Sequence, residues 1–160
     1  MKKSSKGFSL IELLIVVAII LIIAAIAIPN LLRSRIAANQ ASAVGSLRTL
    51  NTAEITYSST YNVGFTQTLT YLAPPATASN PTSTAAGLID SVLAAGAKSG
   101  YSFTFSPGAS DSTGRINTYS FIAVPITSST GTNYYFTDQS GVIRQNSTST
   151  AASTDSPIAG

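Results

Sequence analysis

Hydrophobic residues are distributed unevenly along the chain, and their longest run lies near its beginning. Residues 8–28 are apolar except for Ser9 and Glu12. A helix of about 20 residues, rising ~1.5 Å per residue, is long enough to cross the ~30 Å hydrocarbon core of a bilayer. Because the run is apolar on every side, it predicts a helix that is buried in lipid or in an assembly of helices.

Beyond this run the pattern becomes amphipathic but keeps a helical period. Apolar side chains recur at multiples of three to four positions, with polar side chains between them; they are Ile36, Ala43, Leu47, Leu50 and Tyr57. We therefore predict one long helix over residues 8–58, with residues 8–28 as its membrane or filament-core part. Pro29 lies between the two halves, and its missing N–H and its ring predict a kink or local melting there.

From residue 101 onward the hydrophobic period changes from that of a helix to two. Aromatic residues alternate with small polar residues from Tyr101 to Ser106, which is typical of a half-buried strand. Short connections that contain glycine follow, and they favour antiparallel neighbours. The pattern predicts three further strands, at residues 118–127, 133–137 and 141–145.

These elements predict an α+β fold. A lone antiparallel sheet leaves one apolar face wet, and the amphipathic half of the long helix carries a complementary stripe. We expect the C-terminal half of the helix to pack on a four-stranded antiparallel sheet. Residues 59–145 then form a globular head, with a loop at 73–84 and a short helix at 85–97. The Ser/Thr-rich tail, residues 146–160, is expected to be mobile.

Net charge adds little to the predicted fold and indicates no strongly charged partner. The chain has nine basic and six acidic residues, a formal charge of +3. Three of the basic residues, Lys2, Lys3 and Lys6, belong to the first seven positions, so removing residues 1–7 leaves six of each sign. A nearly neutral chain lacks the electrostatic footprint of a nucleic-acid binder, and no nucleic-acid partner is predicted.

The chain contains no histidine and no cysteine. These absences exclude disulfides, the common Ser-His and Cys-His nucleophile pairs and every zinc site that contains histidine. A paired-carboxylate site is unsupported, because the six acidic residues are scattered. We therefore predict that the protein is not an enzyme and has no catalytic residues, cofactor or metal.

A distinctive junction precedes the apolar run. Residues 6–12 read Lys-Gly-Phe-Ser-Leu-Ile-Glu, which places Glu12 four positions after Phe8. A carboxylate costs roughly 2.5–3.5 kcal/mol at the centre of a membrane span and less near its end, so Glu12 requires a partner or a function. The junction, the apolar run and the closing Pro29 together are similar to the N-terminal segment of type IV pilin precursors.

The resemblance implies how this segment is used. Prepilin peptidase would remove residues 1–7 as a leader by cutting after Gly7, and the new N-terminal residue, Phe8, would be N-methylated. Glu12 of one copy would pair with the Phe8 α-ammonium of a neighbour and so set the register of assembly. The chain departs from the family at Leu21, where members often have a glycine that helps the helix to melt, and at Ser9, where threonine is more frequent.

The resemblance also implies the pilin fold and a function as a structural subunit of a type IV pilus. The precursor would sit in the bacterial inner membrane with its head outside, and the mature protein would form an extracellular filament. Its partners would be copies of itself, the prepilin peptidase and methyltransferase, the pilus assembly machinery and, before assembly, the inner membrane. The family serves motility and cell adhesion, among other roles.

Three other interpretations remain open at this point. Glu12 lies so near the start of the span that it can reach the interface as part of an ordinary anchor. A pseudopilin of a type II secretion system shares the same segment up to Pro29. Finally, Ala25-Ile26-Ala27 fits the small-x-small pattern of ordinary signal peptidase, and cleavage after Ala27 would release a soluble secreted protein.

Weaker motifs have simpler explanations. Two D-x-S/T-G segments, beginning at Asp111 and Asp138, are typical of turns, because one carboxylate is too few for calcium. The tyrosines fall at helix or strand spacing, which favours packing over stacking on single-stranded DNA. Residues 146–148 read Asn-Ser-Thr, a glycosylation-type sequence, and the tail hydroxyls are possible sites of O-linked sugar.

Overall fold

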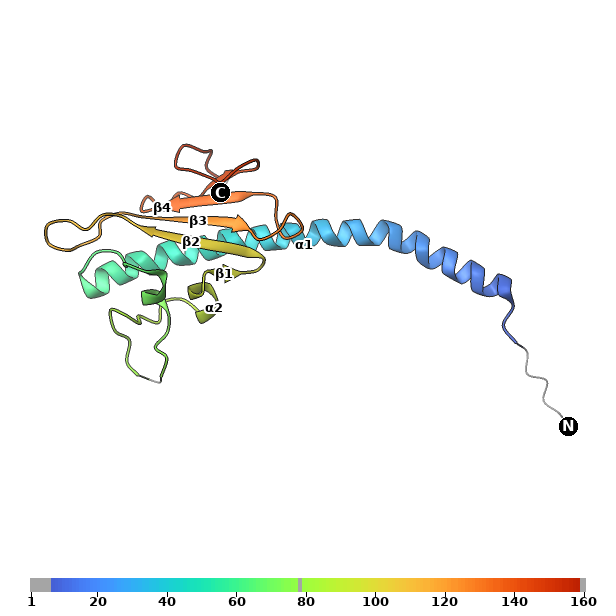
Figure 1. Cartoon of the computed structure of the whole chain (residues 1–160), viewed down its shortest axis with the longest axis horizontal. Coiled ribbons are helices and arrows are strands. Elements are labelled where there is room, and N and C mark those ends of the chain that lie inside the picture. Colours follow the sequence, from blue (N-terminus) through green and yellow to red (C-terminus); the bar gives the residue numbers. More distant parts are fainter. Residues whose placement is uncertain (1–6, 78, 159–160) are drawn as a thin grey trace. The chain divides into compact units, whose positions relative to one another are not determined.

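A single long helix, α1 (Leu10–Tyr61), runs through the first part of the computed structural model, which describes residues 7–77 and 79–158 (Figure 1). The helix begins two residues later and ends three residues later than predicted. It ends because Asn62 turns to a φ of 54° and Gly64 to a φ of 85°, both in the left-handed region that stops a helix. The contacts divide the chain into two compact units, which meet between Arg35 and Ile36.

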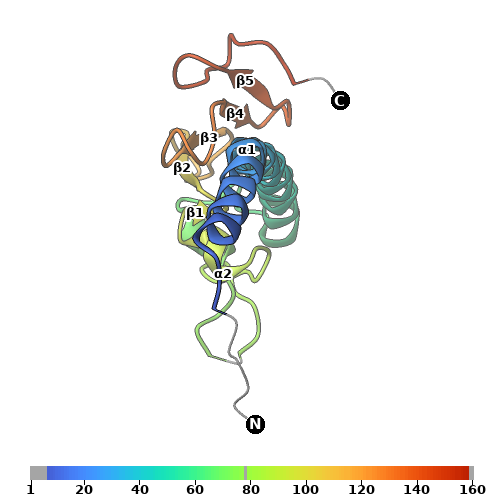
Figure 2. The ribbon, with the colours of Figure 1, turned by 90° about the vertical axis from the view of Figure 1, so that its right-hand side faces the viewer.

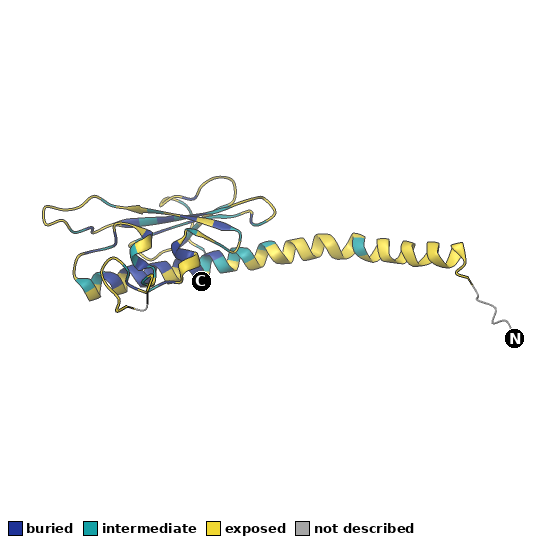
Figure 3. Ribbon diagram, turned by 60° about the horizontal axis from the view of Figure 1, so that its bottom comes forward, coloured by how far each residue is buried: buried dark blue, intermediate teal, exposed yellow. Residues whose placement is uncertain are grey.

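The first unit presents a surface of almost entirely exposed apolar side chains along its part of α1. Every Leu, Ile and Val from Leu10 to Leu32 is at least 44% exposed, and Figure 3 shows this part of the helix as almost entirely exposed. Among the described residues, α1 is the one helix that is long and apolar enough to cross a membrane. An apolar surface of this size requires lipid or another protein to cover it.

The second unit contains a sheet of five antiparallel strands in the order β1-β2-β3-β4-β5. Figures 1 and 2 show the strands lying side by side along the second half of α1. The α+β architecture is therefore confirmed. The strands are β1 (Ala97–Lys98), β2 (Tyr101–Pro107), β3 (Tyr119–Pro125), β4 (Tyr134–Asp138) and β5 (Arg144–Asn146).

The prediction of four strands was wrong by one. The short helix expected over residues 85–97 is only one turn, α2 (Ser91–Ala94), and the residues after it form β1. Gly96 has a φ of 78° and ends α2, while Ser99 and Gly100 have φ values of 50° and 76° and make the tight turn from β1 into β2. These left-handed positions fold the segment back onto the sheet.

The core lies between the sheet and one face of α1. Side chains alternate between buried and exposed along β2, as a sheet with one covered face requires. At the contact between helix and sheet, large apolar side chains with almost no exposed surface include Leu47 and Leu50 from the helix, Tyr101 from β2 and Phe121 from β3. Burying each such side chain contributes about 1.5–3 kcal/mol, so this contact is the main stabilisation of the second unit.

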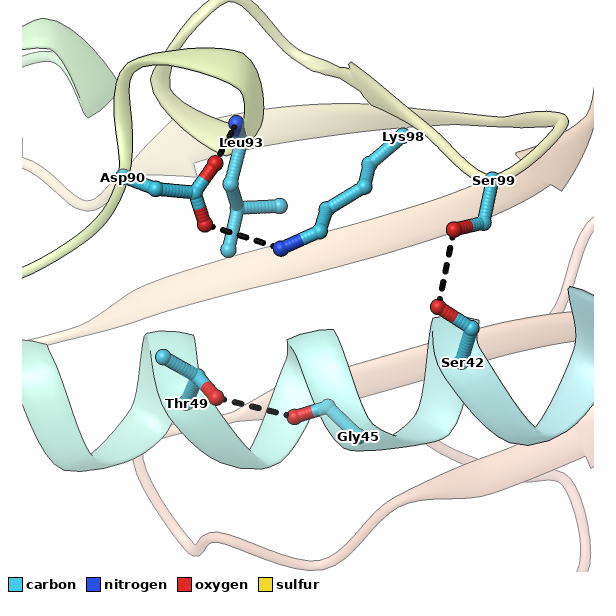
Figure 4. Close-up of polar contacts among 7 residues, drawn as sticks. All are labelled: Ser42, Gly45, Thr49, Asp90, Leu93, Lys98 and Ser99. Atoms are coloured by element: carbon cyan, nitrogen blue, oxygen red, sulfur yellow. Dashed lines mark hydrogen bonds and ion pairs between the residues drawn. The ribbon is translucent and has the colours of Figure 1, made fainter.

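Polar side chains fix the helix in register with the sheet. Asn51 donates from Nδ2 to Thr137 Oγ1 (2.8 Å) and accepts from the Tyr119 hydroxyl at Oδ1 (3.1 Å), both in the buried core. Near the other end of the sheet, the Ser42 hydroxyl donates to Ser99 Oγ at 2.9 Å (Figure 4). Among the described residues, no buried side-chain nitrogen or oxygen lacks a hydrogen-bond partner.

The segment between α1 and β1 is irregular but anchored at several points. It contains the short 3₁₀ helix η1 (Leu69–Leu72), and the backbone N–H of Phe65 donates to the Ile116 carbonyl at 2.7 Å. Asp90 caps α2: its Oδ1 accepts from the Leu93 N–H at 2.9 Å, and its Oδ2 pairs with Lys98 Nζ at 2.8 Å (Figure 4). The loop is therefore held by its ends and by its apolar side chains.

The Ser/Thr-rich tail is packed against the sheet, contrary to the expectation that it is mobile. The Gln145 N–H donates to the Ser156 carbonyl and the Ile158 N–H to the Ile143 carbonyl, so the tail pairs along β5. Ala151 is only 2% exposed. The tail thus covers an edge strand whose unpaired backbone groups would otherwise be open to another chain.

The close approach of Gly64 to residue 116 generates a first testable prediction. A Cβ at Gly64 would collide with the backbone of Ile116, whereas a Cβ at Gly114 would meet nothing within 4 Å, although both glycines have φ near 80°. Gly64→Ala should lower the free energy of unfolding by about 3 kcal/mol or more, and Gly114→Ala by only about 1 kcal/mol of backbone strain.

Chemical denaturation of the full chain in detergent micelles, followed by tyrosine fluorescence, measures both values. Gly114→Ala is the matched control, because it carries the same strain without the collision. Equal losses in the two variants would show that the Gly64–Ile116 approach is not a constraint on the fold.

Candidate processing and assembly site

The predicted cleavage junction lies in an open part of the structure. Gly7 and Phe8 precede α1, and the Phe8 side chain is 86% exposed. Among the described residues other than its chain neighbours, no atom lies within 4 Å of the position that a Cβ of Gly7 would occupy. The peptide bond between the two residues is therefore accessible to an enzyme. Lys2, Lys3 and Lys6, which precede it, lie outside the described residues.

Glu12 caps the helix in which it lies. Ser9 precedes the first helical residue, and its backbone N–H donates to Glu12 Oε2 at 2.9 Å. In return the Ile11 N–H donates to the Ser9 hydroxyl at 3.4 Å. This arrangement is a capping box, in which two otherwise unpaired N–H groups at the start of a helix find acceptors. The negative carboxylate is also favoured by the positive end of the helix dipole.

This cap was not predicted from the sequence, although the pattern Ser-x-x-Glu at residues 9–12 is its recognised signal. The cap changes the interpretation of Glu12, because the carboxylate has a partner within its own chain. It uses only one carboxylate oxygen: among the described residues, Oε1 accepts no hydrogen bond. Glu12 can therefore remain in the cap and still accept a cation from a second copy.

The other predicted positions of this segment lie inside α1. Pro29 has helical residues on both sides, so α1 is continuous through it, and the kink or local melting remains a prediction. Leu21 is 63% exposed. Ala27, after which ordinary signal peptidase would cut, also lies within the continuous helix rather than in an extended segment.

The D-x-S/T-G segment at Asp111 forms a turn saturated with hydrogen-bond donors. The Asp111 carboxylate accepts from the Thr113 N–H and hydroxyl, from the Arg115 N–H and from Asn117 Nδ2, at 2.7–3.0 Å. These bonds, led by the one from the Thr113 side chain, hold the pKa of Asp111 well below its usual range. Because hydrogen-bond donors contact both carboxylate oxygens of Asp111, neither oxygen is free to bind a cation.

The second such segment is a turn as well. Asp138 Oδ1 accepts from the Ser140 N–H at 2.9 Å, and the Asp138 carbonyl accepts from the Gly141 N–H, also at 2.9 Å. No group of three or more acidic residues suited to a metal ion occurs in the described part of the chain. Both D-x-S/T-G segments therefore form turns, as their sequences predicted.

Four tyrosines and the Asn of the glycosylation-type sequence make contacts within the fold. Tyr57, Tyr101, Tyr119 and Tyr135 are buried in the core, which is the packing role expected from their spacing. Asn146 has its amide engaged at both ends: Oδ1 accepts from the Thr148 N–H at 2.9 Å, and Nδ2 donates to Asp155 Oδ1 at 3.1 Å.

Comparison with known proteins places the motif in a family. The family model described as the prokaryotic N-terminal methylation motif matches residues 2–28. The type IV major pilin protein PilA of Myxococcus xanthus is 52% identical over 50 residues, which are 31% of this chain and 23% of that protein. The type IV wide pilus major component PilA4 of Thermus thermophilus is 65% identical over 37 residues, 23% of this chain and 28% of that protein. No solved structure gives a significant match.

These matches confirm the predicted resemblance. The chain carries the N-terminal methylation motif of type IV pilins, on an α+β fold consistent with that of pilins. The matched segments span about a quarter of the length of the two curated relatives. Gly7, Phe8 and Glu12 all lie within residues 2–28, which the family model matches.

The saturated Asp111 turn generates a second prediction. Calcium at millimolar concentration should leave the melting temperature of the protein unchanged, because both Asp111 oxygens already accept hydrogen bonds. Since folding lowers the pKa of Asp111 from 3.8, its stabilising contribution is present above that pH and is lost as the pH falls further. Asp111→Asn should therefore melt at a lower temperature than the wild type at pH 7, and the difference should shrink in acid. A calcium-dependent rise in melting temperature that Asp111→Asn abolishes would contradict this view.

Proposed function

We propose that this protein is a structural subunit of a type IV pilus. The observation that carries the proposal is the first part of α1, where a long surface of exposed apolar side chains follows a Gly7–Phe8 junction and contains one capped carboxylate. Two curated relatives, matched over 50 and 37 residues, are named as a type IV major pilin and a type IV wide pilus major component. The same segment, through the methylation motif, connects the chain to processing at its N-terminus.

The precursor is anchored in the bacterial inner membrane by the apolar part of α1. Prepilin peptidase cuts the exposed bond after Gly7, and Phe8 becomes the N-terminal residue and is methylated. Methylation leaves the amine positively charged. Processing therefore creates a cation at the start of a helix, next to the Glu12 cap, where the helix dipole and the membrane both disfavour it.

Assembly supplies a partner for this unfavourable cation. The Phe8 ammonium of one copy pairs with the Glu12 Oε1 of a neighbour while Ser9 keeps Oε2, and a copy docked at the wrong height leaves both charges in an apolar medium. Packing of the Ile, Leu, Val and Ala side chains between copies supplies the attraction. A contact between two different surfaces that does not close into a ring produces a fibre, so the heads end outside on an extracellular filament.

The structure of the head favours a pilus over a secretion pseudopilin, whose major subunits often carry an acidic calcium loop. The candidate loops at Asp111 and Asp138 are turns organised by donors. The third interpretation, cleavage after Ala27, would remove the segment that the methylation motif matches.

Processing is tested by the mass of the mature protein. The chain isolated from a sheared cell-surface fraction should begin at Phe8 and be heavier than the unmodified chain by one methyl group, as measured by intact-mass and fragmentation mass spectrometry. A chain that begins at Ile28 would refute the proposal, because the apolar half of α1 would then be absent from the exported protein.

The role of Glu12 is tested by two substitutions that separate charge from capping. Glu12→Ala removes both, and Glu12→Gln keeps an acceptor for the Ser9 N–H but removes the charge. Leaving an ammonium unpaired in an apolar core costs about 3–5 kcal/mol, which corresponds to a factor of about a hundred or more in affinity, so both variants should be cleaved normally but yield far less fibre. The measurement is the quantity of sheared filament relative to processed protein in the membrane.

Fibre at the wild-type level from Glu12→Gln would show that Glu12 acts only as a cap. A failure of cleavage in both variants would instead place Glu12 in recognition by the peptidase.

A further inference from the structure

Glu54 is a carboxylate completely enclosed by the second unit. Its side chain is 0% exposed, on the face of α1 that packs against the sheet. Both of its oxygens contact one residue of the segment after the helix: Oε2 accepts from the Thr66 backbone N–H at 3.0 Å, and Oε1 lies 2.5 Å from the Thr66 hydroxyl. Thr66 is itself 0% exposed. The pair therefore fastens residues 62–72 to the helix from within.

No cation of the described chain pairs with this carboxylate. The ion pair found among the described residues joins Lys98 to Asp90, at the surface of the head. The titratable groups that sense the charge of Glu54 are two phenols, Tyr57 on the same helix and Tyr119 on β3. Tyr119 also senses Asp138 at the end of β4, and Tyr57 senses Tyr61 and Tyr71. All of these groups are neutral or negative, so the charge of an ionised Glu54 meets no opposite charge, and only the two hydrogen bonds from Thr66 favour it.

Burial therefore raises the pKa of Glu54 above its usual 4.5, against the opposing effect of the two hydrogen bonds from Thr66. The contacts themselves survive protonation, because a carboxyl group can donate to the Thr66 hydroxyl and still accept from the N–H. Ionisation keeps the contacts but places a charge where water cannot reach it. An open arrangement of residues 62–72, in which water reaches Glu54, is then favoured.

We propose that the Glu54–Thr66 pair is a pH-operated lock, which holds residues 62–72 against α1 while Glu54 is protonated and loosens them when it ionises. The segment covers part of the core: Leu69 and Leu72 are buried, and the Phe65 ring lies 4.7 Å from that of Tyr119, between centroids. Loosening it exposes these side chains locally without unfolding the strands. The lock lies wholly in the second unit, so it operates whether or not the protein forms a filament.

The direction of this pH effect follows from the linkage between proton binding and folding. A carboxyl whose pKa is raised by folding contributes its full stability below the unfolded pKa, here about 4.5, and loses it as the pH rises through the folded pKa. Between those two values, the equilibrium constant for opening residues 62–72 should increase up to about tenfold per pH unit, the limit for one proton.

Hydrogen exchange of the full chain in detergent micelles, from pH 4.5 to 8.5, tests the lock. Peptides that cover residues 62–72 are compared with the same peptides of Glu54→Gln at each pH, so that the intrinsic exchange rates cancel. The ratio of wild-type to variant exchange should rise with pH and then level off, whereas the ratio for peptides from β2 to β4 should stay constant. A ratio for residues 62–72 that does not change with pH overturns the proposal.

Thr66→Val keeps the carboxylate and tests the lock independently, including the case in which Glu54→Gln does not fold. It removes the hydroxyl that stabilises the ionised form, so exchange of residues 62–72, referenced to β2–β4, should continue to rise to a higher pH than in the wild type. A pH profile identical to that of the wild type would overturn the proposal. Asp155→Asn, which removes a carboxylate in the tail instead, is the control and should leave the wild-type profile unchanged.

Discussion

The structure depends on one constraint: a single continuous helix carries two apolar surfaces, and the chain covers only one of them. The stripe that contains Leu47 and Leu50 is buried by the sheet of the same chain. The apolar surface from Leu10 to Leu32 has no cover among the described residues. Since exposed surface of this extent is strongly unfavourable in water, the first part of the helix must always be in lipid or against other helices. A protein built in this way is suited to move from a membrane to a filament without refolding its head.

The acidic residues form hydrogen bonds that help to hold together a chain with no disulfides and few charges. It has six, and each accepts a hydrogen bond from a backbone N–H a few residues away or, for Glu54, on the next segment. Glu12 and Asp90 cap helices, Asp111 and Asp138 organise turns, Asp155 closes the tail, and Glu54 holds the segment after α1. Each carboxylate therefore has a role in the local fold, and no three of them form a cluster in the described part of the chain.

Two of these carboxylates lie where a charge is costly, and their surroundings separate their roles. Glu12 lies at the end of an apolar surface and uses one oxygen for its own helix, which leaves the other for a second copy. Glu54 uses both oxygens for Thr66 and has no exposed surface. The first therefore has an oxygen available for the contact that we propose between molecules, and the second has the enclosed position that we propose for control within one molecule. Neither is neutralised by a cation of its own described chain, so each responds to its environment.

The sequence by itself determined the features that depend on neighbouring residues. The long helix, the four main strands and the N-terminal methylation motif were predictable, because helical and strand periods and the recognition of a short motif are local properties. The cap formed by Ser9 and Glu12 was predictable in the same way, although it was missed. The tertiary structure alone decided the rest: the short strand β1, the packed tail, the Asn51 network and the Glu54–Thr66 contact. Each of these requires segments distant in sequence to meet or a turn to reverse the chain, and the energy of such contacts exists only once the core has formed.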